Sequence, residues 1–227
     1  MSRISIVLPI LNEEAHVAAC LRALQPLRGQ NCELIVADGG SQDRSAALAA
    51  PLADRVVVGS RGRAAQMNAG ARQASGDILW FLHADSLPPP DALSLIRAAL
   101  AGQERGWGRF DVRLSGCRPS LRMVEFSMNL RSGLTGIATG DQGIFVRRGL
   151  FERIGGYPPI ALMEDIALSR TLKRYSRPVC LRQRVLTSSR RWERDGIART
   201  VLLMWRLRLA YFLGADPDRL ARIYYRS

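Results

Sequence analysis

The sequence lacks the motifs that mark several common classes of nucleotide-binding and metal-binding protein. The turn after the first apolar segment, residues 9–12, has no GxGxxG motif, which counts against a Rossmann dinucleotide site. GxxxxGK(S/T) is also absent, which counts against a P-loop enzyme. The four cysteines form no CxxC pair, so the sequence indicates reduced thiols in a cytoplasmic protein, without a disulfide framework or a zinc site.

Long apolar runs and a secretory signal are missing as well. No stretch is long and apolar enough to predict a membrane-spanning helix. The apolar residues 4–8 are too few for a signal peptide, and the acidic Glu13 and Glu14 follow soon after. Aromatic residues are not interleaved with basic ones in an RNA-binding pattern, so nucleic acid is not an expected partner.

Acidic residues are too few to balance the basic ones, and the net charge of +13 is unevenly distributed. Residues 1–100 are neutral overall, whereas residues 101–179 and 180–227 carry +6 and +7. This excess suits an anionic ligand, an anionic membrane surface, nucleic acid or a solvated face that aids solubility. The apolar and arginine-containing residues 197–213 are expected to pack onto the rest of the protein, form a homodimer contact or attach the protein peripherally to the inner face of the membrane.

Strand and helix patterns alternate regularly over residues 1–100. Strands are predicted at residues 5–8, 33–37, 55–58 and 77–82, with helices between them. Asn12 is expected to cap the first helix, with Glu13 and Glu14 in its first turn. Further strands are predicted at 107–114 and 144–146, and a helix at 121–131. The alternation predicts an α/β protein with a parallel sheet.

Polar side chains follow each of the first four strands. They are Asn12 and Glu13, Asp38 and Asp43, Arg61 and Arg63, and His83 and Asp85. Because ligands bind at the carboxyl edge of parallel sheets, these turns are expected to form one site. Asp85 precedes three prolines, and it could hold a divalent cation against a diphosphate or cap the following helix. Arg61 and Arg63 could contact the diphosphate or lie in an exposed loop.

The sequence resembles the family 2 glycosyltransferases, which have the GT-A fold. The resemblance depends on segments in the family's order and spacing: IVLPILNEE at residues 6–14, VADGGSQD at 36–43, RGR at 61–63, NAG at 68–70, GDILWFLHAD at 76–85, GDQG at 140–143 and MED at 163–165. His83 departs from the family's DxD pattern, in which an aspartate takes its place. The variant LHAD, with SSRRW at residues 188–192, is similar to a small bacterial subfamily that includes arsenosugar-biosynthesis glycosyltransferases.

The resemblance covers residues 3–195 and implies an α/β fold with a Rossmann-like mixed sheet flanked by helices. It implies a GT-A domain at 1–195, made of a nucleotide-binding half at 1–100 and an acceptor half at 101–195. A basic amphipathic helical extension is expected at 196–227. The implied activity is an inverting, metal-dependent transfer of a sugar from a nucleotide-diphosphate sugar, a UDP-sugar, to a hydroxyl of a small-molecule or lipid acceptor.

By the same resemblance, the donor nucleotide would be bound by Pro9, Glu13, Asp38, Arg61, Arg63, Asn68, His83 and Ala84. Asp85 would bind Mg²⁺ or Mn²⁺, which stabilises a diphosphate leaving group. His83 has three interpretations: a metal ligand, a contact to the ribose, or a structural histidine. Imidazole is a poor ligand of magnesium but an acceptable one of manganese, and a contact to the ribose or to a ligand of the metal is preferred.

The acceptor side would be formed by Asp141, Gln142, Arg191 and Trp192. Asp165 would be the general base of the single displacement, with Glu164 orienting it or the acceptor. Without the resemblance, these two acids would be ordinary residues of a first helical turn, and the acceptor-side residues a polar turn and a helix start. The alternative functions are a nucleotidyltransferase and a noncatalytic basic module that binds membrane or nucleic acid.

Overall fold

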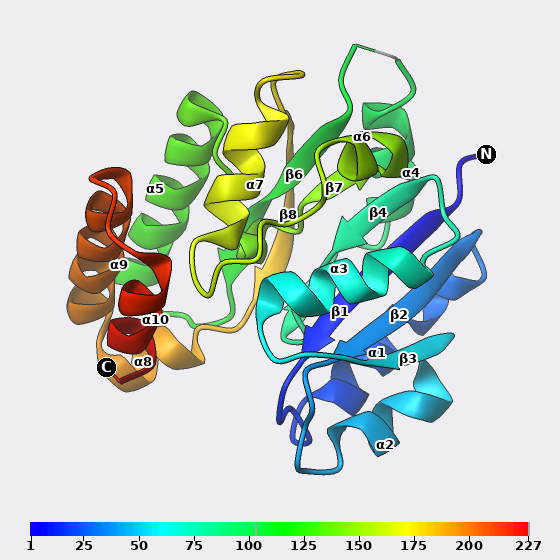
Figure 1. Ribbon diagram of the computed structural model, residues 1–227, viewed down its shortest axis with the longest axis horizontal. Helices are drawn as coiled ribbons and strands as arrows, with labels where there is room; N and C mark the ends of the chain where they lie inside the picture. The colour runs from blue at the N-terminus through cyan, green and yellow to red at the C-terminus, as the bar shows by residue number, and fades with distance from the viewer. Residues whose placement is uncertain (103, 227) are drawn as a thin grey trace.

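The computed structural model describes residues 1–102 and 104–226, so the last residue of the predicted C-terminal extension, Ser227, lies outside the described residues. Within them, an eight-stranded sheet has the order β3-β2-β1-β4-β7-β6-β8-β5 (Figure 1). Its first half contains β1 (Ile4–Ile10), β2 (Cys32–Asp38), β3 (Arg55–Val58) and β4 (Ile78–Phe81). These four strands are parallel to their neighbours in this half, which confirms the parallel arrangement predicted for residues 1–100.

The second half of the sheet mixes strand directions. Its strands are β5 (Ser86–Leu87), β6 (Trp107–Leu114), β7 (Phe145–Arg147) and β8 (Val179–Thr187). β7 is antiparallel to both β4 and β6, β8 is parallel to β6, and β5 is antiparallel to β8. The predicted mixed α/β sheet is therefore confirmed.

Helices cover both faces of the sheet, because its central strands are apolar on both sides. One face carries α1 (Val17–Arg28), α2 (Ser45–Ala49) and α4 (Ala92–Ala99), and the other carries α3 (Arg63–Gln73), α6 (Arg148–Arg153) and α7 (Glu164–Leu172). The remaining helices are α5 (Pro119–Thr135), α8 (Arg190–Asp195), α9 (Ile197–Phe212) and α10 (Pro217–Arg226). A 3-10 turn, η1 (Ala50–Leu52), follows α2, and another, η2 (Gly140–Gln142), precedes β7. Along the described chain, none of the helices combines the length and the apolarity that crossing a membrane requires.

The C-terminal helices pack against the start of α7. Leu207 of α9 and Leu220 of α10 are both 2% exposed and lie in one apolar cluster with Met163 and Ile166. Packing of the extension onto the rest of the protein, one of the three expectations for this segment, is therefore confirmed. The cluster connects the end of the chain to the helix that carries the predicted catalytic acids.

The predicted cap of the first helix is wrong. Helix α1 begins at Val17, and Asn12 has a left-handed backbone, with a φ of 54°. Its Oδ1 accepts a hydrogen bond from the backbone of Gln42 (2.9 Å), and the backbone N–H of Glu13 donates to Ser45 Oγ (2.7 Å). The turns after β1 and β2 are thus connected by hydrogen bonds. Because Asn12 and Glu13 take part in these bonds, α1 begins only at Val17, and Glu13 lies outside its first turn.

The alternative interpretation of Asp85 as a helix cap is also wrong. Helix α4 begins only at Ala92, and its N-cap is Asp91. Asp85 lies in the turn between β4 and β5 instead, at the carboxyl end of a completely buried strand. This position is the one that the sequence predicts for a ligand-binding carboxylate.

Candidate active site

A cavity of about 770 Å³ opens at the carboxyl edge of the parallel strands. Seven of the predicted site residues line it: Pro9, Glu13, Arg61, Arg63, His83, Ala84 and Asp85. They come from the end of β1 and the segments after β1, β3 and β4, so three of the four predicted groups meet at this cavity, whereas Asp38 and Asp43, at and after the end of β2, do not line it. The size is within the range of pockets that bind small molecules and cofactors.

Gln66 holds the ends of two strands beside this cavity. Its buried Nε2 donates hydrogen bonds to the carbonyls of Ile10 (2.5 Å) and Ala37 (3.0 Å). A Cβ on Gly39 would lie 2.8 Å from the same nitrogen, so this position has no room for a side chain. The sequence analysis missed Gln66, because a glutamine inside a helix resembles any exposed polar residue.

Arg61 and Arg63 border the cavity on either side of a glycine. Gly62 has a φ of 125°, a backbone conformation that residues with a side chain rarely adopt. This turn ends immediately before α3, and both arginine side chains are exposed. Two exposed guanidinium groups at the edge of a cavity are well suited to bind phosphate oxygens.

Glu13 and Asp85 lie close to each other in the lining of this cavity. Burial raises the pKa of Glu13, and the nearby charge of Asp85 raises it further, whereas Arg190 opposes both effects. Asp85 accepts a long hydrogen bond from Thr187 Oγ1 (3.5 Å). In the part of the chain that the structure describes, no group of three or more His, Cys, Asp or Glu residues is placed to hold a metal ion.

His83 joins the predicted donor side to the predicted acceptor side. Its Nδ1 lies 3.3 Å from Asp141 Oδ1. Desolvation lowers the pKa of His83, but the hydrogen bond and charge of Asp141 outweigh this effect and raise the pKa above its ordinary value. Asp141 is half-buried beside the cavity, and the same contact lowers its pKa. The ring of His83 also packs tightly against Gly140, where a Cβ would lie 2.5 Å from Nε2.

Glu164 and Asp165 begin α7, and their carboxyl groups have different environments. Glu164 is 6% exposed, and its pKa is raised to about 7 by burial and by the charge of Asp165, with Arg63 opposing. The two oxygens of Asp165 accept hydrogen bonds from the backbone of Gly140 (2.9 Å) and Ile166 (2.7 Å). The preceding Met163 has a φ of 68°, an uncommon conformation that costs of order 1–3 kcal/mol. The backbone is thus strained where these acids are held.

The other two predicted donor-side residues bond within the protein. Asp38 is buried at the end of β2, where Ser41 donates to it through its backbone N–H (3.1 Å) and its hydroxyl (2.5 Å). Asn68 exchanges two hydrogen bonds with the backbone of Tyr157, at 2.8 and 2.9 Å. Asp38 therefore shapes the turn beside the cavity, and Asn68 attaches α3 to the loop before α7.

The other predicted acceptor-side residues also have protein partners. Gln142 is completely buried, and its Oε1 accepts a hydrogen bond from the backbone of Thr139 (3.2 Å). Arg191 donates to the carbonyl of Tyr224 (2.9 Å), and its guanidinium lies 3.7 Å from the centre of the Tyr224 ring. Trp192 packs against the apolar cluster formed by β6 and α5. Arg191 thus contacts α10, the helix that also lines the cavity through Asp218 and Tyr225.

That helix, α10, supplies residues of the cavity that the sequence analysis missed. Asp218 and Tyr225 line it, together with the loop residues 159–161. These positions carry no motif, and α10 reaches the cavity through its packing against α9 and α7. Only knowledge of this packing could have identified them.

The arrangement defines a class of fold that is known from solved structures. A mannosyltransferase from Pyrobaculum calidifontis, solved with GDP-Man and Mn²⁺, matches 99% of this chain and 68% of its own, with a TM-score of 0.67 and 20% identity. Glucosyl-3-phosphoglycerate synthase from Mycobacterium tuberculosis, solved with UDP and Mn²⁺, matches 82% of this chain and 71% of its own, with a TM-score of 0.61 and 22% identity. The predicted GT-A fold is confirmed.

Residues 5–154 match the model of glycosyl transferase family 2, and the chain belongs to this family. It is 35% identical over 159 residues to an undecaprenyl-phosphate 4-deoxy-4-formamido-L-arabinose transferase from Pseudomonas paraeruginosa, and this match covers 63% of the chain and 46% of the relative. A PGL/p-HBAD biosynthesis glycosyltransferase from Mycobacterium bovis is 33% identical over 168 residues, or 67% of the chain and 62% of the relative.

The chain spans less than two thirds of the length of each of these relatives. The alignment with the arabinose transferase spans slightly less than half of that protein's length. The comparisons do not confirm the narrower resemblance to arsenosugar-biosynthesis glycosyltransferases, which stays a prediction.

Proposed function

We propose that the protein transfers a sugar from a nucleotide-diphosphate sugar to an acceptor, with inversion at the sugar carbon. The observation that carries this proposal is the single cavity in which Arg61, Arg63 and Asp85 meet at the carboxyl edge of the sheet. Cationic and carboxylate groups together suit a diphosphate and its counter-cation. UDP is the preferred nucleotide, and the solved neighbours with UDP or GDP-Man and Mn²⁺ support this class of donor.

We propose that Asp85 holds Mg²⁺ or Mn²⁺ together with the donor's phosphate oxygens. The residues present fit such an ion, because Glu13 and Asp85 line one cavity and repel each other electrostatically. Since no group of three protein ligands is arranged among the described residues, the diphosphate and water would complete the coordination. When bound, the cation would neutralise the charge that develops on the leaving diphosphate.

His83 is better suited to contact the ribose or a phosphate than to coordinate the metal. Its pairing with Asp141 raises its pKa, so the ring keeps its proton at higher pH than an isolated histidine. A metal ligand must be the neutral imidazole. Pro9 and Ala84 line the same cavity as His83, and Asp38 shapes the adjacent turn, so these residues would form the walls around the nucleotide.

The acids at the start of α7 are proposed to remove the proton of an acceptor hydroxyl. The family resemblance assigns this role to Asp165, whose two hydrogen bonds hold it in place. Glu164 is a second candidate, because a base is most effective when its pKa lies near the working pH. Asp141 and Gln142 precede β7 beside this pair and would belong to the acceptor side, and Arg191 and Trp192 would support it from α8.

A phosphate acceptor is a second candidate, and Arg131 is the observation that favours it. Its Nη2 is buried without a hydrogen-bond partner among the described residues. Desolvation and the neighbouring charge of Arg208 lower its pKa to about 10, while Asp165 opposes them. An anionic acceptor would relieve the repulsion between the charges of Arg131 and Arg208. Because a phosphate is already ionised, its transfer reaction would need no general base. The relative named for undecaprenyl phosphate supports this class.

The test of the donor and metal is thermal stabilisation by UDP, GDP, ADP and CDP and by the corresponding triphosphates, each with and without Mn²⁺. We expect one nucleotide to raise the melting temperature with Mn²⁺, equivalent to about 2.7 kcal/mol at one hundred times its Kd. Asp85→Asn should remove the effect of Mn²⁺, and the matched variant Asp91→Asn at the exposed start of α4 should keep it. No response to any diphosphate would contradict the proposal, and a response to triphosphates alone would indicate a nucleotidyltransferase.

Three expectations stay predictions. They are the division into a domain at 1–195 and an extension at 196–227, the cytoplasmic location, and the homodimer.

A further inference from the structure

Two neighbouring helices expose apolar side chains at helical spacing. On α5 they are Met123, Phe126, Leu130 and Leu134, which are 48–74% exposed. On α9 they are Leu202, Trp205, Leu209 and Phe212, which are 56–64% exposed. Other side chains of the two helices, including Val124 and Val201, meet in a shared apolar cluster. The eight exposed residues therefore lie on adjoining helices and form one outward surface, here called the apolar face. Large exposed patches of this kind mark interaction sites.

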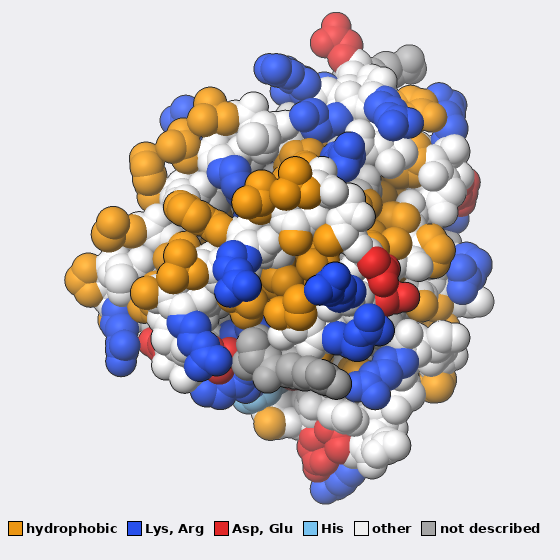
Figure 2. Space-filling view, turned by 60° about the vertical axis from the view of Figure 1, so that its left-hand side comes forward, with side chains coloured by type: hydrophobic (Ala, Val, Ile, Leu, Met, Phe, Trp, Pro, Cys, Tyr) orange, Lys and Arg blue, Asp and Glu red, His pale blue; other side chains and the backbone are white. Residues whose placement is uncertain are grey.

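The apolar face is bordered by positive charge. Helix α9 contains no acidic residue, and the single acid of α5, Glu125, is 4% exposed and accepts a hydrogen bond from the backbone of Leu114. Arg170 lies over the ring of Phe212, 5.9 Å from its centre, and Lys173 donates to the carbonyl of Thr135. Figure 2 shows Lys and Arg side chains among hydrophobic ones on this side of the molecule.

We propose that the apolar face docks onto a lipid surface that contains anionic headgroups. Helices with one apolar and one basic face bury their apolar side chains at the headgroup boundary, where arginine and lysine meet phosphate. Charge complementarity favours this partner over a second copy of the chain, since two copies of a surface bordered by arginine and lysine repel each other.

The position of the apolar face connects it to the cavity. Helix α10 follows α9 after four residues and lines the cavity through Asp218 and Tyr225. Helix α7 carries Arg170 at one end and the acidic pair Glu164 and Asp165 at the other. Docking would therefore place the acceptor side of the cavity near the lipid surface. Lipid binding requires neither donor nor acceptor, so its failure would leave the proposed function standing.

The test is sedimentation of the full chain with vesicles of phosphatidylcholine alone or mixed with phosphatidylglycerol. We expect binding to the mixed vesicles only, and weaker binding at high salt. The double variant Trp205→Gln/Leu209→Gln should weaken binding at least tenfold. The control is Val58→Gln, which removes a 69% exposed apolar side chain from β3, away from the apolar face. Tryptophan emission should also shift to the blue on binding, and the Trp205→Gln/Leu209→Gln variant should lose this shift, because Trp80 and Trp107 are buried and Trp192 is partly buried in the cluster of β6 and α5.

A second pair of variants tests the charge. Arg170→Gln/Lys173→Gln should weaken binding several-fold, whereas Arg72→Gln, on the exposed side of α3, should not. Equal binding to vesicles of pure phosphatidylcholine would overturn the electrostatic part of the proposal. Absence of vesicle binding would overturn the whole, and a dimer that the Trp205→Gln/Leu209→Gln variant dissociates would then identify a second copy as the partner.

Discussion

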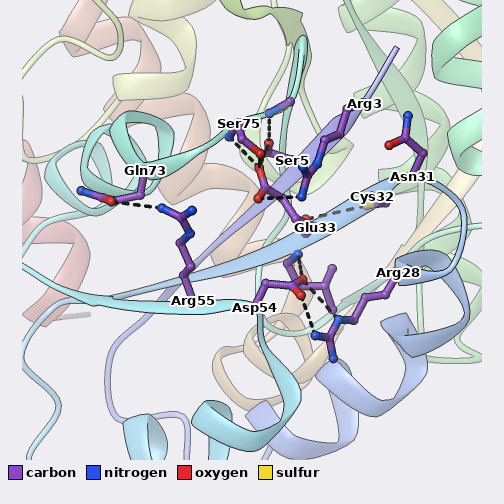
Figure 3. Close-up of polar contacts among 12 residues, drawn as sticks. Arg3, Ser5, Arg28, Asn31, Cys32, Glu33, Asp54, Arg55, Gln73 and Ser75 are labelled. Atoms are coloured by element: carbon purple, nitrogen blue, oxygen red, sulfur yellow. Dashed lines mark hydrogen bonds and ion pairs between the residues drawn. The ribbon is translucent and has the colours of Figure 1, made fainter. Parts of the chain in front are cut away.

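Glutamates near the two ends of the parallel strands have pKa values shifted in opposite directions. At the amino end, Glu33 is 3% exposed and accepts hydrogen bonds from Ser5 Oγ (2.5 Å), Ser75 N (2.6 Å) and Ser75 Oγ (2.9 Å), with Arg3 at 3.3 Å (Figure 3). Desolvation raises the pKa of Glu33, but these contacts outweigh it and lower the pKa below its ordinary value. The charge of Glu33 is therefore stable inside the protein.

At the carboxyl end, Asp38 and Asp141 have polar partners, but Glu13 and Glu164 lack such compensation. Burial raises the pKa of both Glu13 and Glu164, which means that the fold disfavours their charged forms. The amino end thus uses charge to stabilise the fold, whereas the carboxyl end keeps groups whose charge costs stability. This cost is the usual consequence of a site prepared for a ligand.

The largest expected effect is the loss of turnover when the acidic pair is changed. With a hydroxyl acceptor, replacing the base should lower kcat by roughly 10²–10⁴-fold while donor binding is retained. Asp165→Asn and Glu164→Gln are compared separately, and Glu152→Gln on the exposed side of α6 is the control. Inactivity of the Glu164→Gln variant alone would contradict the assignment to Asp165, and full activity of both would favour the phosphate acceptor.

The Glu164→Gln substitution should also stabilise the fold. Between pH 4.5 and about 7, folded Glu164 keeps a proton that the unfolded chain has lost, so the stability of the wild type falls as pH rises through this window. At pH 8 the neutral variant should therefore be more stable by up to about 3 kcal/mol. Denaturant titrations at pH 5 and pH 8 measure this difference, and an equal effect at both would contradict the raised pKa.

Next in size is the loss of stability from Glu33→Gln. The amide cannot accept all the hydrogen bonds of the buried carboxylate, so we expect a loss of about 2–3 kcal/mol, or roughly 4–12 °C in Tm. Because the folded pKa is lowered, this contribution is present above pH 4.5 and is lost as the pH falls through the folded pKa. The difference in unfolding free energy between wild type and variant should therefore become smaller at low pH. The kcat per folded molecule should stay unchanged at any pH where both are folded. A Glu33→Gln variant with normal Tm but reduced turnover would contradict this prediction, because it would assign Glu33 to catalysis and not to stability.

The smallest expected effect comes from Gly140→Ala. Its methyl group would collide with the ring of His83 and displace it from Asp141, so the affinity for the donor nucleotide should fall about 3–10-fold, or roughly 1 kcal/mol. Gly149→Ala, at a position with no atom within 4 Å of the added Cβ, is the control. Equal donor affinity in the two variants, measured by calorimetry, would exclude His83 from the donor site.

The sequence predicted the parallel strands and the cavity residues at their ends well, because both depend on local patterns. An apolar run followed by a polar turn identifies β4 and then His83 and Asp85 without knowledge of any other segment. The Asn12 cap failed because its competitor, the turn after β2, lies thirty residues away along the chain. Asn68 belongs to a recognised motif but binds the backbone of Tyr157, a partner that no motif specifies.

By itself, the sequence determined the class of fold, the positions of the first four strands along the chain and the polar turns that follow them. Only the tertiary structure decided which of these groups interact. It paired His83 with Asp141, buried Glu164 beside Asp165, and brought Asp218 and Tyr225 of the last helix into the cavity. The physical reason is that strands and turns depend on neighbouring residues, whereas burial, pKa values and cavities depend on which distant surfaces pack together.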